Sequence, residues 1–142
     1  MIRGAFETAG ELDPTELRAA YDEALADAIE SVGVSAAAEQ TNLDESTLRA
    51  VVDGETPDLS LDAAATIFAL DDDHPDADVL VAEARDILLM GMSAAVLDVE
   101  AIAAGIDDEL EPKEIQQKIE GRYSMTLDEY ALLHAFIENR KR

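Results

Sequence analysis

Apolar side chains recur every three or four positions along most of the chain, a spacing that predicts helices rather than strands. Turn and capping residues separate the apolar runs and set the bounds of each helix. The expected helices cover residues 14–32, 36–41, 45–53, 61–70, 75–97, 99–105, 112–120 and 127–142. The pattern therefore predicts an all-α fold.

Several helix ends carry capping signals that can be read directly. Asp13 with Glu16, and Thr126 with Glu129, have the spacing of a capping box, in which side chain and backbone at the first turn satisfy each other. The expected single N-caps are Ser35, Asp44, Ser60 and Asp98. The expected helix-ending glycines are Gly33, Gly54 and Gly121, and Gly91 marks an expected bend in the long helix 75–97.

The second half of the chain repeats the order of elements of the first half, across the acidic run 71–78. The corresponding positions are Leu43, Leu48, Val52, Gly54 and Leu61 in one half and Leu110, Ile115, Ile119, Gly121 and Leu127 in the other. This order predicts two tandem helical units, 13–72 and 73–142, packed around a shared core and preceded by a flexible arm at 1–12. Coincidence between two helical patterns is the alternative.

The first unit resembles the Cro/C1-type helix-turn-helix family over residues 21–70. The matching features are the small pair Ala37–Ala38, "TNLDESTL", the pair Val51–Val52, the stop "DG" and the capped "SLDAAATIFAL". The resemblance implies that Ala38 lies at a close helix contact, that Leu43 and Leu48 are core residues, and that the helix from Glu45 faces DNA. The whole chain also resembles small acidic helix-turn-helix-like families of unknown function from halophilic archaea.

Composition adds an acidic balance and a core of small side chains. Among 142 residues, 33 acids oppose 10 bases for a net charge of -23, 48% are hydrophobic and only 4% are aromatic. Ala and Leu favour helices. The excess of acids with scarce Lys is typical of proteins from halophilic archaea, where salt screens the self-repulsion. Without Cys no disulfide forms.

Bases gather in the second unit, which is where we expect any DNA contact. Residues 113–142 have a net charge of +1, against -24 for residues 1–112. The expected DNA-binding residues are Lys113, Gln116, Gln117, Arg122, Arg140, Lys141, Arg142 and, in the first unit, Arg49. Lys113, Gln116 and Gln117 would contact base edges or phosphates, Arg122 and the C-terminal bases would contact the DNA backbone, and Arg49 suits guanine or phosphate. Alternatively, the C-terminal bases only stabilise the last helix through its dipole.

For two further residues the sequence predicts a place relative to the core but no functional role. Lys118 stands where the family has an apolar residue, so either its stem packs inward with the amine in water or the alignment is off by one. His134 is expected at the edge of the core. It lies far along the chain from His74, and neither belongs to a metal-binding motif.

No catalytic, cofactor or metal signature is found, so we expect a protein that is not an enzyme. The acidic run 71–78 lacks the glycine and the final acid of a calcium loop. The longest apolar run, 87–97, is too short to span a bilayer, and the N-terminus does not have the form of a signal peptide. A soluble, cytoplasmic protein without a small-molecule ligand is expected.

Two functions follow as hypotheses. The first is a DNA-associated transcriptional regulator that acts through the second unit. The second is a non-enzymatic adaptor that keeps the fold, does not bind DNA and binds a protein. The run 87–97 is expected as a central core helix, or alternatively as a homodimer or partner-binding face.

Overall fold

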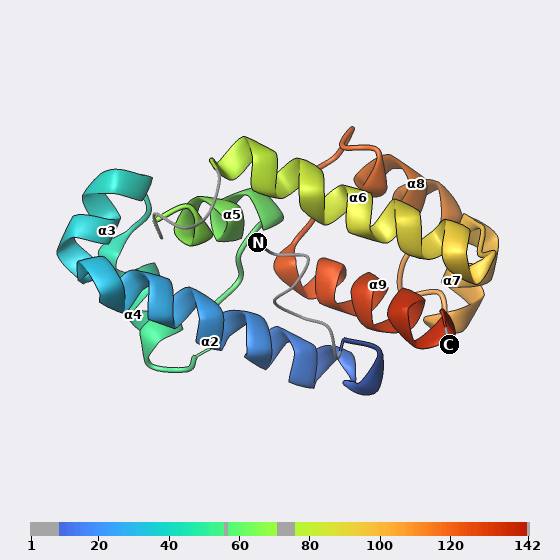
Figure 1. The fold of residues 1–142 in the computed structure, drawn as a ribbon, viewed down its shortest axis with the longest axis horizontal. Helices are drawn as coiled ribbons and strands as arrows, with labels where there is room; N and C mark the ends of the chain where they lie inside the picture. The colour runs from blue at the N-terminus through green and yellow to red at the C-terminus, as the bar shows by residue number, and fades with distance from the viewer. Residues whose placement is uncertain (1–8, 56, 71–75, 142) are drawn as a thin grey trace.

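The computed structural model describes residues 9–55, 57–70 and 76–141, and these residues form helices joined by turns (Figure 1). The elements are η1 (Ala9–Glu11), α2 (Pro14–Val32), α3 (Val34–Thr41), α4 (Glu45–Val52), α5 (Leu61–Phe68), α6 (Ala77–Ala95), α7 (Val99–Gly105), α8 (Pro112–Ile119) and α9 (Leu127–Arg140). Over the described residues no strand is present, and extended backbone pairs only at the bridge between Ser60 and Thr126. The predicted all-α class is confirmed.

The long helices form the centre of the molecule, and the short ones lie at its two ends. Helix α2 packs against α4 and α9, while α6 packs against α5 and α9. Helices α3 and α4 lie at one end and α7 and α8 at the other (Figure 1). The largest fully buried side chains are Leu17, Leu25, Ile29, Leu48, Ile67, Leu80, Leu88, Ile102, Ile115, Met125, Leu133 and Ile137. They form a single apolar cluster that joins both halves of the chain.

The predicted capping boxes are confirmed. The Asp13 carboxylate accepts from the Glu16 backbone N–H at 2.8 Å, and Glu16 accepts from the Asp13 N–H at 3.0 Å. Thr126 and Glu129 make the same exchange at 3.0 and 2.9 Å. Local capping thus sets the first turn of both α2 and α9.

Two expectations about helix ends and bends are wrong. Helix α3 begins at Val34 rather than after Ser35, because Gly33, at φ +89°, turns the chain and acts as the N-cap. The Ser35 hydroxyl instead donates to Glu45 at 3.4 Å. Helix α6 is continuous through Gly91, where a Cβ would lie 2.5 Å from the Ile137 side chain of α9. This glycine permits close helix packing rather than a bend. The predicted start at Pro75 lies outside the described residues.

Residues 9–12 of the predicted arm contact the rest of the fold. These residues include η1, which packs on α9, and Ala9 is buried there. The Asn139 side chain donates to the Gly10 carbonyl at 3.0 Å, and a Cβ on Gly10 would meet the Glu138 carbonyl oxygen at 2.9 Å. Residues 1–8 of the predicted arm lie outside the described part.

Equivalent local features recur in the two halves. Helices α4 and α8 both end before a glycine with positive φ, Gly54 at +79° and Gly121 at +83°. The backbone N–H of the residue after each glycine donates to the carbonyl five residues earlier, at 2.9 Å in both cases. The buried positions Leu17, Tyr21, Leu25 and Ala28 of α2 match Leu80, Ala84, Leu88 and Gly91 of α6 at a constant offset. These matches support a repeat, while the duplication and the boundaries 13–72 and 73–142 stay predictions.

The region that resembles a helix-turn-helix has a short, tight turn. Three residues join α3 to α4, and Asn42 is left-handed at φ 60°. Leu48 is fully buried and Leu43 partly so. Ala37 is the fully buried small residue of α3, while Ala38 is only partly buried.

His134 lies in the core and not at its edge, which corrects the sequence expectation. Its side chain is 4% exposed, and its Nδ1 lies 2.5 Å from the Tyr21 hydroxyl of α2. Burial lowers the pKa of His134 from 6.5 to about 4, so the ring is neutral, and its Nδ1 shares a hydrogen bond with the Tyr21 hydroxyl. Tyr130 stands beside both rings and donates to the Ala84 carbonyl of α6 at 2.9 Å. The cluster therefore links α2, α6 and α9.

Lys118 packs partly inward, with 17% of its side chain exposed, and its amine has a partner in the fold. The side chain is largely buried and its Nζ pairs with the Glu129 carboxylate. Glu129 also closes the capping box of α9 through its other oxygen. An ammonium that is partly withdrawn from water is stabilised by such a partner, so the pair links α8 to the start of α9.

None of the described helices is by itself long and apolar enough to cross a membrane. Helices α6 and α7 meet that criterion only as a pair, and the chain bends by 93° between them.

Candidate functional site

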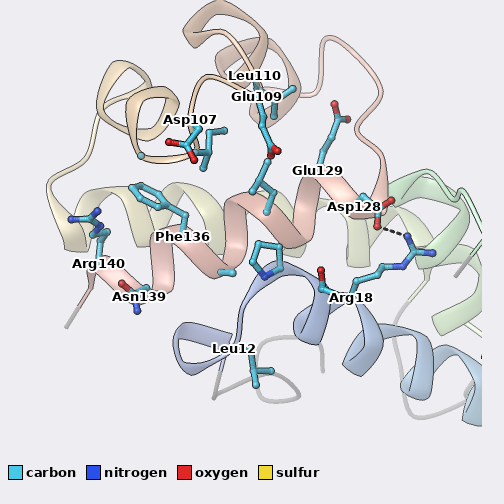
Figure 2. A pocket seen from close by; sticks show the side chains of 16 residues that line it. Leu12, Arg18, Asp107, Glu109, Leu110, Asp128, Glu129, Phe136, Asn139 and Arg140 are labelled. Atoms are coloured by element: carbon cyan, nitrogen blue, oxygen red, sulfur yellow. Dashed lines mark hydrogen bonds and ion pairs between the residues drawn. The ribbon is translucent and has the colours of Figure 1, made fainter.

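A groove of about 990 Å³ opens between α9, the start of α2 and the connection from α7 to α8 (Figure 2). Helix α9 forms its floor. Residues 12–18 form one wall, and residues 105–110 form the other. The two walls are far apart in the sequence, and each packs against α9 through its own contacts.

The floor of the groove is an apolar stripe along α9. Leu132, Ala135 and Phe136 line it, and they follow one another at the spacing of a single helix face. Leu132 and Phe136 are only partly buried, so their side chains remain open to the groove. Leu12 and Leu110 extend this apolar surface onto the two walls.

The rim beside α7 and α8 is acidic. Asp107 and Glu109 line the groove there, and Figure 2 shows both carboxylates near its opening. Both are exposed, and neither forms an ion pair with a cation in the described part of the chain. Asp107 and Asp108 are left-handed, at φ 57° and 59°, a conformation that aspartate tolerates better than most residues. The turn therefore places several carboxylates at this edge of the groove.

Arg18 lies at the opposite wall, and its guanidinium makes its contacts within the fold. Its guanidinium is buried, pairs with Asp22 at 3.1 Å and Asp128 at 2.6 Å, and donates to the Pro57 carbonyl at 2.5 Å (Figure 2). Burial raises the pKa of Asp22, although Arg18 opposes that shift. Arg18 therefore joins α2, the loop before α5 and α9, and offers no free charge to a ligand.

Arg140 closes one end of the groove. Its guanidinium carbon lies 4.9 Å from the centre of the Phe136 ring, a cation–π arrangement (Figure 2). Gly105 of α7 lies against the same ring, and a Cβ there would be only 2.1 Å from it. Phe136 is thus held between a cation and a backbone at this end of the floor.

The sequence-predicted DNA-binding residues of α8 share one helix face. Lys113, Gln116 and Gln117 stand three and four residues apart, and the first two are exposed while Gln117 is half-buried. The Gln116 amide donates to Glu120 at 3.3 Å. Lys113 has no ion-pair partner among the residues that the structure describes. The exposed acids at 107–109 and 111 directly precede this helix.

Most of the remaining predicted cations have acidic partners close by. Arg122, in the turn before α9, pairs with Glu120 at 3.3 Å. Arg140 and Lys141 lie at the C-terminal end of α9, where Arg140 lines the groove together with residues 105–110. Lys141 pairs with Glu138 at 3.0 Å, and Arg49 of α4 pairs with Glu45 at 2.9 Å. Arg142 lies outside the described residues. Neighbouring acids therefore offset most of these charges.

Sequence reasoning missed the groove, although part of it was visible. The pattern of residues 107–111 indicates only a polar turn between helices, yet the apolar residues Ile106 and Leu110 lie beside and within it. This mixture of apolar and acidic side chains was the sequence signal for a binding surface. The contact of this turn with α9 and the start of α2 could not be inferred from local pattern.

No group of three or more His, Asp or Glu side chains suited to a metal ion occurs over the described residues. The acidic run 71–78 is described only from residue 76 onward.

These features define an all-helical protein with an open, acid-rimmed groove. A family model matches residues 17–140, and the chain belongs to that family, a family of unknown function designated DUF5791. No curated protein and no solved structure matches the chain.

Proposed function

We propose that this protein is a non-enzymatic adaptor that binds a basic, amphipathic segment of a partner protein in the groove on α9. The observation that carries the proposal is the open apolar floor beside the Asp107 and Glu109 carboxylates, which form no ion pair with a cation among the described residues. An amphipathic helix that lays its apolar face in a groove is a recurrent mode of peptide recognition. Basic side chains on the flanks of that helix would meet the acidic rim.

The charge of the whole chain favours the same partner. A net charge of -23 attracts basic segments and repels nucleic acids over distances beyond direct contact. The groove is open along its length, so an occupant would bury one face and keep the other in water. That geometry suits a peptide segment better than an enclosed small molecule.

The test is binding of a designed amphipathic Lys/Leu peptide, followed by fluorescence anisotropy. Asp107→Lys/Glu109→Lys should weaken its affinity at least about tenfold. Asp53→Lys/Glu55→Lys is the matched control, because it makes the same charge change at exposed acids beside α4. A scrambled peptide of equal charge should bind more weakly. Equal losses in both variants, or equal binding of both peptides, would refute groove recognition.

The second candidate is a DNA-associated transcriptional regulator that uses α8. The observation that favours it is the shared face of Lys113, Gln116 and Gln117, since Lys and Gln suit phosphate or base contacts. The Cro/C1-type helix-turn-helix resemblance supports it, with the three-residue turn between α3 and α4. The acidic residues before α8 oppose it, because they would face phosphates.

The two candidates separate in a titration with genomic DNA fragments in multimolar KCl, the ionic setting that the halophile-like composition suggests. A regulator requires measurable binding that Lys113→Glu/Arg122→Glu abolishes. Negligible binding by both proteins would eliminate the regulator and leave the peptide experiment to judge the adaptor.

A further inference from the structure

The C-terminal half of α6 presents an apolar face to solvent. Leu89 is 47% exposed, Met90 53% and Val96 91%. Ser93 and Ala94, also exposed, stand between them. Leu88 and Gly91 on the opposite side of the helix are buried in the core. Part of this stretch thus serves the core, and the other side has no partner within the described residues.

We propose that this face, formed by Leu89, Met90, Ser93, Ala94 and Val96, binds a second copy of the same chain. The first reason is electrostatic. Residues 87–97 include no charged side chain, in a chain with a net charge of -23. Two copies repel each other across almost any other pair of surfaces. A basic partner would be drawn to the acidic surfaces, whereas a face without charged side chains, bordered along the chain by acids only at Asp86 and Asp98, allows approach of a partner with the same charge.

The second reason is the conformation of Val96. It ends α6 in the left-handed region, at φ 55° and ψ 51°. A β-branched residue is a rare outlier there, and α2 ends instead at Gly33. Val96 is therefore strained and almost fully exposed, and its side chain gains little within one chain. Burial against a second copy would supply the apolar contact that offsets both effects.

The shape of the face suits a symmetric pairing of helices. Ser93 and Ala94 are short enough for two copies of α6 to cross closely, while Leu89 and Met90 flank the crossing with adaptable side chains. A two-fold axis through such a face makes the interface self-complementary. Figure 2 shows α6 behind α9 as viewed from the groove, so the pairing leaves the groove open. The inference is therefore independent of the proposed function.

The test is the mass in solution, measured by light scattering and sedimentation over a concentration series in about 0.2 M and about 2 M KCl. We expect twice the mass of the chain, with tighter association at high salt because repulsion is screened. Leu89→Glu/Met90→Glu should weaken association at least about tenfold and give the mass of one chain. Circular dichroism should show unchanged helix content, since both side chains are exposed.

The matched control is Val79→Glu/Tyr123→Glu, which adds the same charge at exposed apolar residues outside the face, 52% and 58% exposed. It should stay dimeric. A wild-type chain that is monomeric throughout both salt series would overturn the proposal. So would a Leu89→Glu/Met90→Glu dimer, or loss of the dimer in the control, which would assign the effect to charge alone.

Discussion

At the residue scale, the least expected features are polar groups that the fold has buried or partly buried. Arg18, Lys118 and His134 each have a partner on another element, at Asp128, Glu129 and Tyr21 respectively. A buried polar group without such a partner would be costly. Their positions in the sequence indicated helical spacing but did not identify their partners, because each partner comes from a distant segment.

Burial of neutral His134 predicts that stability falls between pH 6.5 and pH 4. The folded pKa, about 4, lies below the ordinary 6.5, so the unfolded chain binds more protons in this window. The His134 contribution is fully present above pH 6.5, and about 3 kcal/mol of it is lost as the pH falls to 4. Urea unfolding at a series of pH values measures it.

His134→Gln is the control for the carboxylates that titrate over the same range. It removes the imidazole and leaves every acid in place, so the difference in slope between the two proteins belongs to His134. Parallel curves for both proteins would contradict the prediction.

At the element scale, capping chemistry accounts for most helix bounds. The boxes at Asp13 and Thr126 and the caps at Ser60 and Asp98 were predictable, because a cap depends only on residues within one turn. The start of α3 and the role of Gly91 were not. Gly33 turns the chain more sharply than its pattern suggested, and Gly91 responds to Ile137 of another helix.

The end of α6 gives a prediction of its own. Replacement of Val96 by glycine should raise the free energy of unfolding by about 1 kcal/mol, because glycine adopts the left-handed conformation without strain. The measurement is best made in the Leu89→Glu/Met90→Glu background, where association does not contribute.

Gly54→Ala is the control in the reverse direction, because it adds a side chain at a residue with φ +79°. No neighbouring atom lies within 4 Å of the new Cβ. It should lower the free energy of unfolding by about 1 kcal/mol through backbone strain alone. If both substitutions shift stability in the same direction, strain does not explain the end of α6.

At the scale of the whole molecule, a very acidic surface surrounds a single apolar core. The core joins α2, α5, α6 and α9, and the short helices at each end leave most acids in water. Like charges on a compact surface destabilise the folded state, because unfolding moves them apart.

Added KCl should therefore raise the free energy of unfolding, as measured by urea titration at a series of salt concentrations. A variant with Asp53→Asn, Glu55→Gln, Asp107→Asn and Glu109→Gln changes the net charge from -23 to -19. Self-repulsion scales with the square of net charge, so its salt dependence should be smaller by about one third. An unchanged dependence would mean that salt acts through apolar burial rather than charge.

The helical class, most helix ends and the acidic character of the surface follow from the amino-acid pattern. These properties depend on periodicity, capping and composition, which are local or additive. Three features instead arise from long-range packing: residues 12–18 and 105–110 meet along α9 to form a groove, Lys118 pairs with Glu129, and Leu89 and Met90 face water while Leu88 does not. Each of these depends on which distant segments pack together, and helical spacing alone does not specify the partner of a face.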